Sequence, residues 1–257
     1  MHEVPPARHE TVRYHEALYA GPAAGGGPGW WARPHRLVVD GLGLLLPPGP
    51  PGPDGPDGPP VHAYDLGAGS GRHALLLADR LPPSSRVTAV DLLPAALDLL
   101  TAAARRAGLS DRVDTTAADV EEYTFPQADA GFVVAFSVLE HVSSPAALRA
   151  VLARCRAATV LGGLHVVAVL ADRQEVGAHG ARPAPVECPL TAGQARDLLR
   201  GAYQGWETLR EETAATTASE TRGGERYTLA STLVAIVARA PGRLRSPSSS
   251  RSPGNAS

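Results

Sequence analysis

The strongest constraint on the fold is a glycine-rich stretch, DLGAGSGR, at residues 65–72. It lies between an apolar run of strand length and an amphipathic run of helix length. Gly67, Gly69 and Gly71 permit a sharp turn with positive φ angles, and they leave the backbone open to a ligand. The helix that follows presents unpaired N–H groups at its N-terminus. The stretch therefore predicts a ligand-binding strand–turn–helix unit in a parallel sheet.

The spacing of these glycines separates the loop from two other nucleotide-binding motifs. The nicotinamide-binding motif places its third glycine at a position that Arg72 occupies here. A phosphate-binding P-loop ends in lysine and serine or threonine, which this loop lacks. The Tyr-x-x-x-Lys pair of a nicotinamide-binding oxidoreductase is also missing from the sequence. Triphosphates and dinucleotides are therefore disfavoured as ligands.

From residue 61 onward, apolar runs of strand length alternate with alanine- and leucine-rich helical runs. This alternation is typical of βαβ units around a parallel sheet. We therefore expect an α/β fold with a Rossmann-like doubly wound sheet in a single domain, mostly parallel, with an antiparallel closing strand pair. Strands are expected at residues 61–66, 86–91, 112–116, 130–137 and 164–170, and the closing pair at 206–212 and 227–239. Helices are expected at residues 9–19, 34–46, 70–81, 94–107, 145–158 and 191–202.

Composition divides the chain into four segments. Residues 1–46 are expected to form an N-terminal helical lid segment, and residues 47–60 a loop of proline, glycine and aspartate. Residues 61–240 form the core. Residues 241–257 are rich in serine, proline and arginine, so this tail is expected to be disordered.

Charge and composition exclude several classes of partner. The formal net charge of -2 gives no general attraction to nucleic acid or to anionic membranes. No window offers about 20 uninterrupted apolar residues, and the first ten residues lack the pattern of a signal peptide. Cys155 and Cys188 are too few for a disulfide scaffold or a zinc site, so no metal is expected. We expect a cytoplasmic protein that binds neither nucleic acid nor a membrane.

Two aspartates follow the next two strands. Asp91 ends the strand RVTAVD about 20 residues beyond the glycines, where a carboxylate binds both ribose hydroxyls of an adenosine. It is equally placed to cap the helix that begins near Pro94. Asp119 lies in TTAADV, where it is either a partner of an adenine amine or a turn residue.

The fourth strand ends in AFSVLEHV, which places Ser137, Glu140 and His141 at the same edge of the sheet. A lone histidine at such a position is more often structural than catalytic. Together with the glycine loop and the two aspartates, however, it becomes a candidate wall of a ligand pocket.

In this order, DLGAGSG, VD, AADV and AFSVLEHV resemble the motifs of class I S-adenosylmethionine-dependent methyltransferases. The resemblance covers residues 61–171, and it implies the methyltransferase fold and S-adenosylmethionine as cofactor. The cofactor-binding residues that it implies are Asp65, Gly67, Ala68, Gly69, Gly71, Arg72, Asp91, Leu92, Asp119, Val120 and Ser137.

The flanks resemble the tellurite-resistance branch of that family. WWARPHRLVVDGL resembles the segment that covers the cofactor there, which implies a cofactor-binding role for Arg33 and includes His35. This branch implies methyl transfer to soft nucleophiles such as metalloid oxyanions or thiols. Its members typically carry a His-Arg pair near the closing hairpin, whereas ASETRGGERY has no histidine and offers Arg222 and Arg226 instead.

Three side chains are candidate catalytic residues on the acceptor side: His35, His141 and Arg226. A histidine can serve as general base for a phenol or an amine, and an arginine can bind an anion. Positioning alone suffices when the acceptor is already an anion. Trp30 and Trp31 either form an aromatic wall over the ligands or anchor the segment to the core.

The expected function is methyl transfer from S-adenosylmethionine to a small-molecule acceptor, by a monomer or homodimer. One alternative is an O-, N- or C-methyltransferase of secondary or quinone metabolism, because the flanks of a shared core set the acceptor. Another is a catalytically silent module that only binds the cofactor.

Overall fold

The computed structural model of the chain describes residues 11–16, 19, 33–46, 58–222 and 225–242. The expected aromatic wall of Trp30 and Trp31, most of the proline- and glycine-rich loop and most of the tail lie outside these residues. No helix among the described residues is both long and apolar enough to span a membrane.

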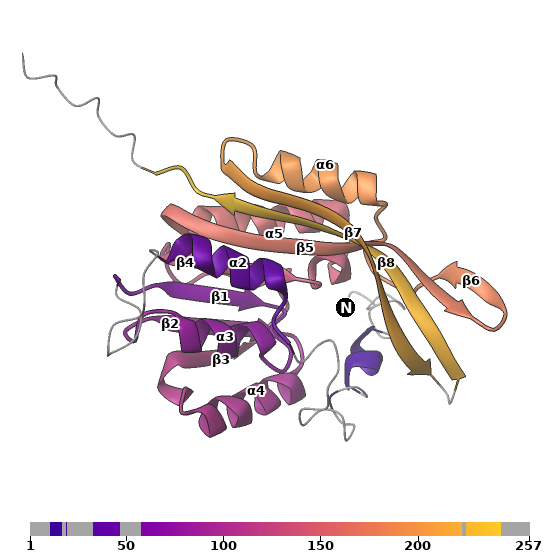
Figure 1. Cartoon of the computed structure of the whole chain (residues 1–257), viewed down its shortest axis with the longest axis horizontal. Coiled ribbons are helices and arrows are strands. Elements are labelled where there is room, and N and C mark those ends of the chain that lie inside the picture. Colours follow the sequence, from indigo (N-terminus) through magenta and orange to yellow (C-terminus); the bar gives the residue numbers. More distant parts are fainter. Residues whose placement is uncertain (1–10, 17–18, 20–32, 47–57, 223–224, 243–257) are drawn as a thin grey trace, which may run out of the picture.

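In the described part of the chain, eight strands form one sheet, in the order β3-β2-β1-β4-β5-β8-β7 with β6 beside β5 (Figure 1). The strands from β1 to β5 pair in parallel, and β8 lies antiparallel between β5 and β7. This confirms the doubly wound, mostly parallel sheet with an antiparallel closing pair. The strand bounds are β1 His62–Leu66, β2 Arg86–Asp91, β3 Val113–Ala117, β4 Ala130–Phe136, β5 Thr159–Gly177, β6 Gly180–Pro183, β7 Glu207–Arg222 and β8 Glu225–Arg239.

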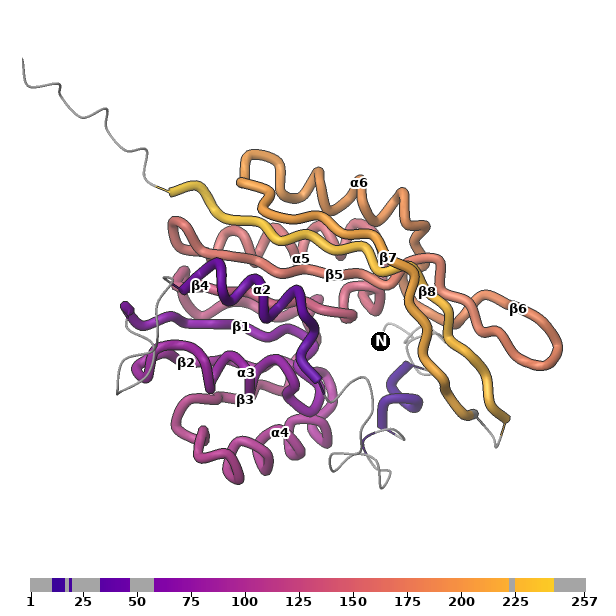
Figure 2. The backbone as a smooth tube through the Cα atoms, in the orientation of Figure 1, coloured from indigo at the N-terminus to yellow at the C-terminus, as the bar shows by residue number. Residues whose placement is uncertain are grey.

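Helices cover both faces of the sheet, and each face has its own apolar core. Helices α2 (Arg36–Leu45), α3 (Arg72–Arg80) and α4 (Pro94–Ala107) contribute leucines to one core. Helices α5 (Pro145–Ala158) and α6 (Ala192–Ala202) do so on the other face. Two short 3-10 helices, η3 (Ser110–Arg112) and η4 (Leu139–His141), connect these elements. Figure 2 shows the same path as a continuous tube.

Helix α2 lies close against the sheet, as the spacing of its apolar residues predicts. Leu37, Val38 and Leu42 are buried. A Cβ atom at Gly41 would come within 2.6 Å of the Val166 side chain on β5, so only glycine permits this approach. The helix positions the segment before it, residues 33–35, at the end of the sheet where the strands β1 and β4 finish.

Two strands are much longer than the sequence predicts. Strand β5 extends on both sides of the expected 164–170, and β7 continues ten residues beyond the expected 206–212. The extension of β7 consists mainly of alanine, threonine and serine, so it lacks the apolar alternation that marks a strand. It is held by continuous pairing with β8. We call residues 213–222 and 225–232 the hairpin arm; it extends beyond the parallel strands β1 to β4 (Figure 1).

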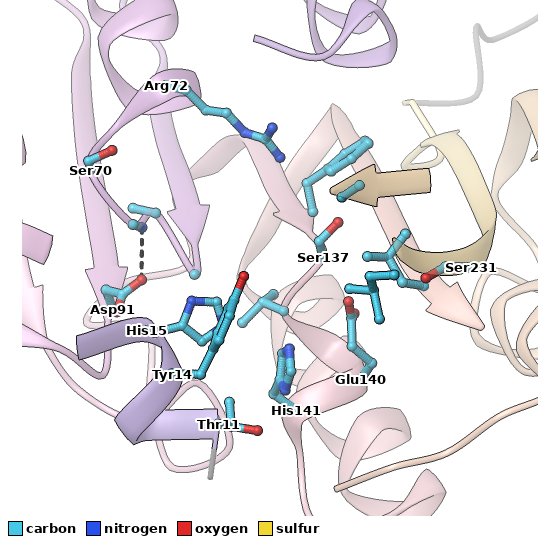
Figure 3. A pocket seen from close by; sticks show the side chains of 18 of the residues that line it. Thr11, Tyr14, His15, Ser70, Arg72, Asp91, Ser137, Glu140, His141 and Ser231 are labelled. Atoms are coloured by element: carbon cyan, nitrogen blue, oxygen red, sulfur yellow. Dashed lines mark hydrogen bonds between the residues drawn. The ribbon is translucent and has the colours of Figure 1, made fainter. Parts of the chain in front are cut away.

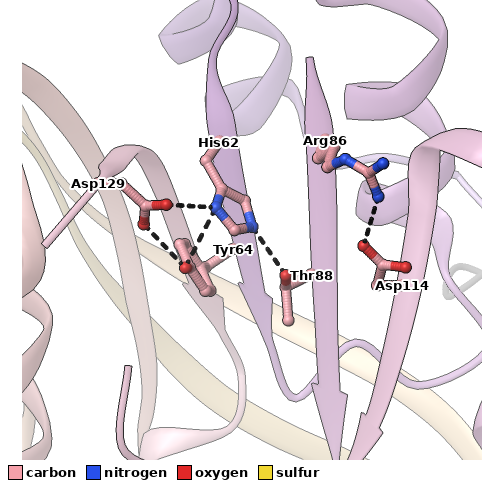
Figure 4. Close-up of polar contacts among 6 residues, drawn as sticks. All are labelled: His62, Tyr64, Arg86, Thr88, Asp114 and Asp129. Carbon is pink, nitrogen blue, oxygen red and sulfur yellow. Dashed lines mark hydrogen bonds and ion pairs between the residues drawn. The ribbon is translucent and has the colours of Figure 1, made fainter. Parts of the chain in front are cut away.

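A polar cluster ties together the opposite, amino-terminal end of the sheet (Figure 4). The His62 ring contacts Asp129 Oδ2 through Nδ1 at 2.9 Å and Thr88 Oγ1 through Nε2 at 2.8 Å. The Tyr64 hydroxyl donates to Asp129 Oδ1 at 3.0 Å. These contacts join β1 to β2 and to the loop before β4, and none of the four residues lines the cavity described below.

Candidate active site

A cavity of about 570 Å³ lies at the carboxyl ends of β1, β2 and β4. Its walls come from the glycine loop, the segment before α2, η4, the hairpin arm and the helical residues 11–16. In Figure 3, Asp91 and Ser70 lie on one side of this cavity, and Glu140, His141 and Ser231 lie on the other. We call these the cofactor side and the acceptor side.

The glycine loop adopts a conformation that requires its glycines. Gly67, Gly69 and Gly71 have φ angles of +71°, +55° and +95°. A Cβ atom at Gly67 would lie 2.5 Å from Val138, and one at Gly71 would lie 2.1 Å from Leu100. Gly67 and Gly69 line the cavity together with Ala68, whereas Gly71 does not line it and serves to start α3.

Asp91 ends β2 with its carboxylate held by the backbone. Its Oδ2 accepts from the Gly69 N–H at 2.8 Å, and its Oδ1 accepts from the Leu93 N–H at 2.9 Å. Burial raises the pKa of Asp91, and the backbone N–H groups oppose that rise. The residue therefore fixes the turn into α4 and also lies on the cavity wall, with Leu92 beside it.

Asp65 lies behind the glycine loop and is not among the residues that line the cavity. It is 1% exposed, and its Oδ2 has no hydrogen-bond partner among the described residues. Burial raises its pKa to about 7, against the opposing effect of Arg72. Arg72 does line the cavity, and its guanidinium lies 5.6 Å from the centroid of the Phe136 ring.

Three further predicted residues line the cavity: Asp119, Val120 and Ser137. Asp119 accepts from the Glu121 N–H at 2.9 Å, so it has the turn role as well as a place on the wall. Ser137 has a φ of +58°, a conformation that residues other than glycine rarely adopt. Such strain concentrates at functional sites.

His35 lines the cavity, but its hydrogen bonds hold the fold together. Its ring Nδ1 accepts from the Leu37 N–H at 3.2 Å and so caps α2. Its backbone N–H donates to His73 Nε2 at 3.2 Å. Burial lowers the pKa of His35, and it lowers that of His73 to about 2. With Nδ1 as acceptor, the neutral ring of His35 carries its proton on Nε2. The ring has no lone pair left to accept a substrate proton.

His141 belongs to a charged network on the acceptor side. Its Nδ1 lies 2.9 Å from Glu187 Oε2, and Arg173 donates to its Nε2 at 3.3 Å. Arg173 also lies 3.9 Å from a Glu140 oxygen. The Thr11 hydroxyl donates to Glu187 Oε2 at 3.1 Å, which joins the network to the N-terminal helical residues.

The helical residues 11–16 and Tyr19 close one side of the cavity. The Tyr14 side chain is hydrogen-bonded to Glu220 of the hairpin arm, and the His15 ring lies 5.8 Å from the His141 ring. Burial lowers the pKa of His15 to about 3, so this ring is neutral near pH 7. The Tyr19 hydroxyl is 2.5 Å from the position of a Cβ atom at Gly69. This segment belongs to residues 1–46, which were expected to form a helical lid; its contacts with Glu220, His141 and Glu187 were not foreseen.

The remaining predicted residues divide between the cavity and the outside. Arg33 lines the cavity, whereas Arg226 lies on β8 opposite Thr221 and is not among the lining residues. Sequence reasoning missed Arg173, Glu187 and Glu220. Glu220 lies in the stretch ASETRGGERY, where only the arginines were singled out, and Arg173 and Glu187 are brought to the site by β5 and the loop after β6.

The site fits S-adenosylmethionine. Gly67 and Gly69 line the cavity without side chains, beside the carboxylate of Asp91. No cluster of metal-binding side chains is found among the described residues.

Comparison with known proteins identifies the domain. Residues 63–163 match a family model described as a methyltransferase domain. No curated protein sequence gives a significant match.

Solved structures resemble the chain at low sequence identity, which establishes the fold. TehB from Haemophilus influenzae aligns with a TM-score of 0.61 and 17% identity, covering 80% of this chain and 62% of TehB, less than two thirds of its length. The Burkholderia thailandensis 1,6-didemethyltoxoflavin-N1-methyltransferase, solved with 1,6-didemethyltoxoflavin and S-adenosylhomocysteine, aligns with a TM-score of 0.56 and 19% identity, covering 94% and 93%. The [4+2]-cyclase SpnF aligns with a TM-score of 0.61 and 19% identity, covering 93% and 98%.

The likeness to TehB leaves the tellurite-resistance branch only weakly supported, because other members of the fold align as well. The domain match, the sheet order and the glycine loop with Asp91 agree with one another. The chain therefore contains a methyltransferase domain at residues 63–163, and its fold is that of the class I S-adenosylmethionine-dependent methyltransferases.

Proposed function

We propose that this enzyme transfers a methyl group to a small organic acceptor at oxygen, nitrogen or carbon, and that metalloid oxyanions are not its acceptors. The cofactor side and the acceptor side belong to one cavity of about 570 Å³. An acceptor bound beside Glu140 and His141 therefore shares that cavity with the cofactor.

The observation that carries this proposal is the charge of the acceptor side. Glu140, Glu187 and Glu220 line it; the Glu140 and Glu187 side chains are 1% and 3% exposed, and Glu220 is partly exposed. An oxyanion bound there would face carboxylates at low local dielectric, which disfavours it. Arg226, the arginine that the sequence offered as a partner for an anion, is not among the residues that line the cavity.

The chemistry follows from positioning. When bound, S-adenosylmethionine supplies an electrophilic methyl group and its own leaving group. The protein holds the acceptor, excludes water and orients the nucleophilic atom, which lowers the barrier by up to roughly 7–11 kcal/mol. A general-base role for His35 is not part of this proposal, because its Nδ1 already accepts from Leu37.

A methyl-transfer assay with labelled S-adenosylmethionine tests the proposal. The acceptor panel contains phenols, amines, N-heterocycles, thiols, tellurite and selenite. We expect labelled product from at least one phenol, amine or N-heterocycle and none from tellurite or selenite, and transfer to thiols alone would contradict the proposal. Methylation of tellurite alone would overturn the proposal. Tight binding of S-adenosylhomocysteine without transfer to any acceptor would favour the silent cofactor-binding module.

A further inference from the structure

Glu140 is a buried carboxylate that the fold leaves without hydrogen bonds. The side chain is 1% exposed, and neither oxygen has a hydrogen-bond donor among the described residues. Its nearest opposite charge is Arg173, at 3.9 Å, which is beyond hydrogen-bond distance. Leaving a buried charged group unsatisfied is costly, so such a group calls for a partner.

The position of Glu140 indicates where that partner comes from. Glu140 lines the cavity and lies beside His141 on the acceptor side (Figure 3). Its backbone carbonyl accepts from the Cys188 N–H at 3.0 Å, which fixes the residue against the loop after β6. The side chain is therefore held at the wall of the cavity, where a bound molecule can donate to it.

The neighbouring groups favour a donor that carries a positive charge. Glu187 also lines the cavity, and its Oε1 has no hydrogen-bond partner among the described residues. Its Oε2 is already used by His141 and Thr11. Glu220 adds a third carboxylate, whereas Arg173 is the cation in contact with this network.

We propose that Glu140 binds a basic nitrogen of the methyl acceptor, so that the substrate class is a small amine or a basic N-heterocycle. This inference rests on the proposed function and narrows it. The nitrogen donates to the free Glu140 oxygens, and Glu187 Oε1 offers a second acceptor beside it. This contact positions the acceptor in the cavity. The nitrogen bound by Glu140 therefore need not be the atom that is methylated.

A fragment screen tests this inference without knowledge of the true substrate. The complex of the full chain with S-adenosylhomocysteine is screened by ligand-observed NMR against equal numbers of cationic, neutral and anionic fragments. We expect cations to dominate the fragments that bind without displacing S-adenosylhomocysteine. A hit list without an excess of cations, including an empty one, overturns the inference.

Matched variants assign the effect to Glu140. Glu140→Gln keeps the shape of the side chain and removes its charge, and Glu122→Gln removes an exposed charge outside the cavity. We expect Glu140→Gln to weaken cationic fragments about 10- to 100-fold, because hydrogen bonds to charged groups are lost, and Glu122→Gln to leave them unchanged. Equal affinities for the cations in both variants overturn the inference.

Binding of S-adenosylhomocysteine, measured by calorimetry on each variant, reports whether the fold is retained. Failure of the inference is distinguishable from failure of the proposed function. If neutral or anionic organic fragments dominate, the organic acceptor stands and the amine is wrong. If tellurite is methylated in the separate transfer assay, the proposed function is wrong.

Discussion

At the scale of single residues, we predict that Asp91 binds the cofactor, because it lines the cavity and both of its oxygens are oriented by backbone N–H groups. Asp91→Asn keeps the size of the side chain, but its NH₂ group must face one of those donors. We expect the affinity for S-adenosylhomocysteine, measured by calorimetry, to fall about 10- to 100-fold, since a hydrogen bond to a charged group is worth roughly 1.5–3 kcal/mol. Asp98→Asn, on the exposed face of α4, is the control. The same loss in both variants would contradict this role of Asp91.

Asp65 makes stability depend on pH. Burial raises its pKa to about 7 from an ordinary value of 3.8. Between these values the folded chain retains a proton that the unfolded chain has lost, so this residue's contribution is full below about pH 4 and disappears as pH rises through 7. Relative to Asp65→Asn, the free energy of unfolding of the natural chain should therefore fall from pH 4 to 7 and then level off. Urea unfolding over that range measures the difference. A difference that does not vary with pH would refute the prediction.

At the scale of elements, two glycines in α2 allow two effects to be tested separately. One is the close packing of the helix against the sheet, and the other is the intrinsic helix propensity of the residue. A Cβ atom at Gly41 would lie 2.6 Å from Val166 Cγ2, whereas one at Gly43 has no atom within 4 Å. We expect Gly41→Ala to lower the free energy of unfolding by about 1–3 kcal/mol through overpacking. Gly43→Ala should raise it by about 0.5–1 kcal/mol, because alanine favours the helix. Chemical denaturation gives both values. If both variants were more stable, α2 would not lie closely on β5.

The elements that the sequence predicts best are those specified locally. The glycine loop, the strand ending in Asp91 and the helices α4 and α5 each have a pattern of apolar residues and a recognisable beginning or end, and the expected bounds agree with the structure. The hairpin arm has no such pattern, since residues 213–222 contain no large apolar side chain. Its strand conformation depends on pairing with β8, which is a tertiary contact.

At the scale of the whole molecule, the acceptor side joins segments that are distant in sequence. Thr11 and Glu187 are 176 residues apart and share a hydrogen bond. His141 meets Arg173 and Glu187, which the sequence did not mark as site residues. A single sequence reveals the cofactor side because its residues follow strand ends in a fixed order. It does not reveal the acceptor side, because those partners are selected by the course of long strands and loops.

Because the two sides of the cavity are built from different segments, we predict that the acceptor side can be removed while cofactor binding is kept. The hairpin arm contributes lining residues to the cavity, and Ser231 among them lies on the acceptor side (Figure 3); they are Thr216, Thr217, Ala218, Glu220, Leu229 and Ser231. Replacing residues 216–231 by Asn-Gly joins β7 to β8 at the pair Ala215 and Thr232, with a turn that suits a two-residue hairpin. We expect this shortened chain to bind S-adenosylhomocysteine with nearly the affinity of the intact chain.

The same chain should lose methyl transfer to the acceptor that the intact enzyme uses. Without the arm, the acceptor side loses a wall and Tyr14 loses its partner Glu220, so water enters and the acceptor is no longer held. Near-UV circular dichroism establishes that the remaining core is folded, and calorimetry and the transfer assay are run on the same sample. Loss of cofactor binding from a folded core would mean that the arm also shapes the cofactor side. Undiminished transfer would mean that the acceptor lies elsewhere in the cavity, closer to the segment before α2.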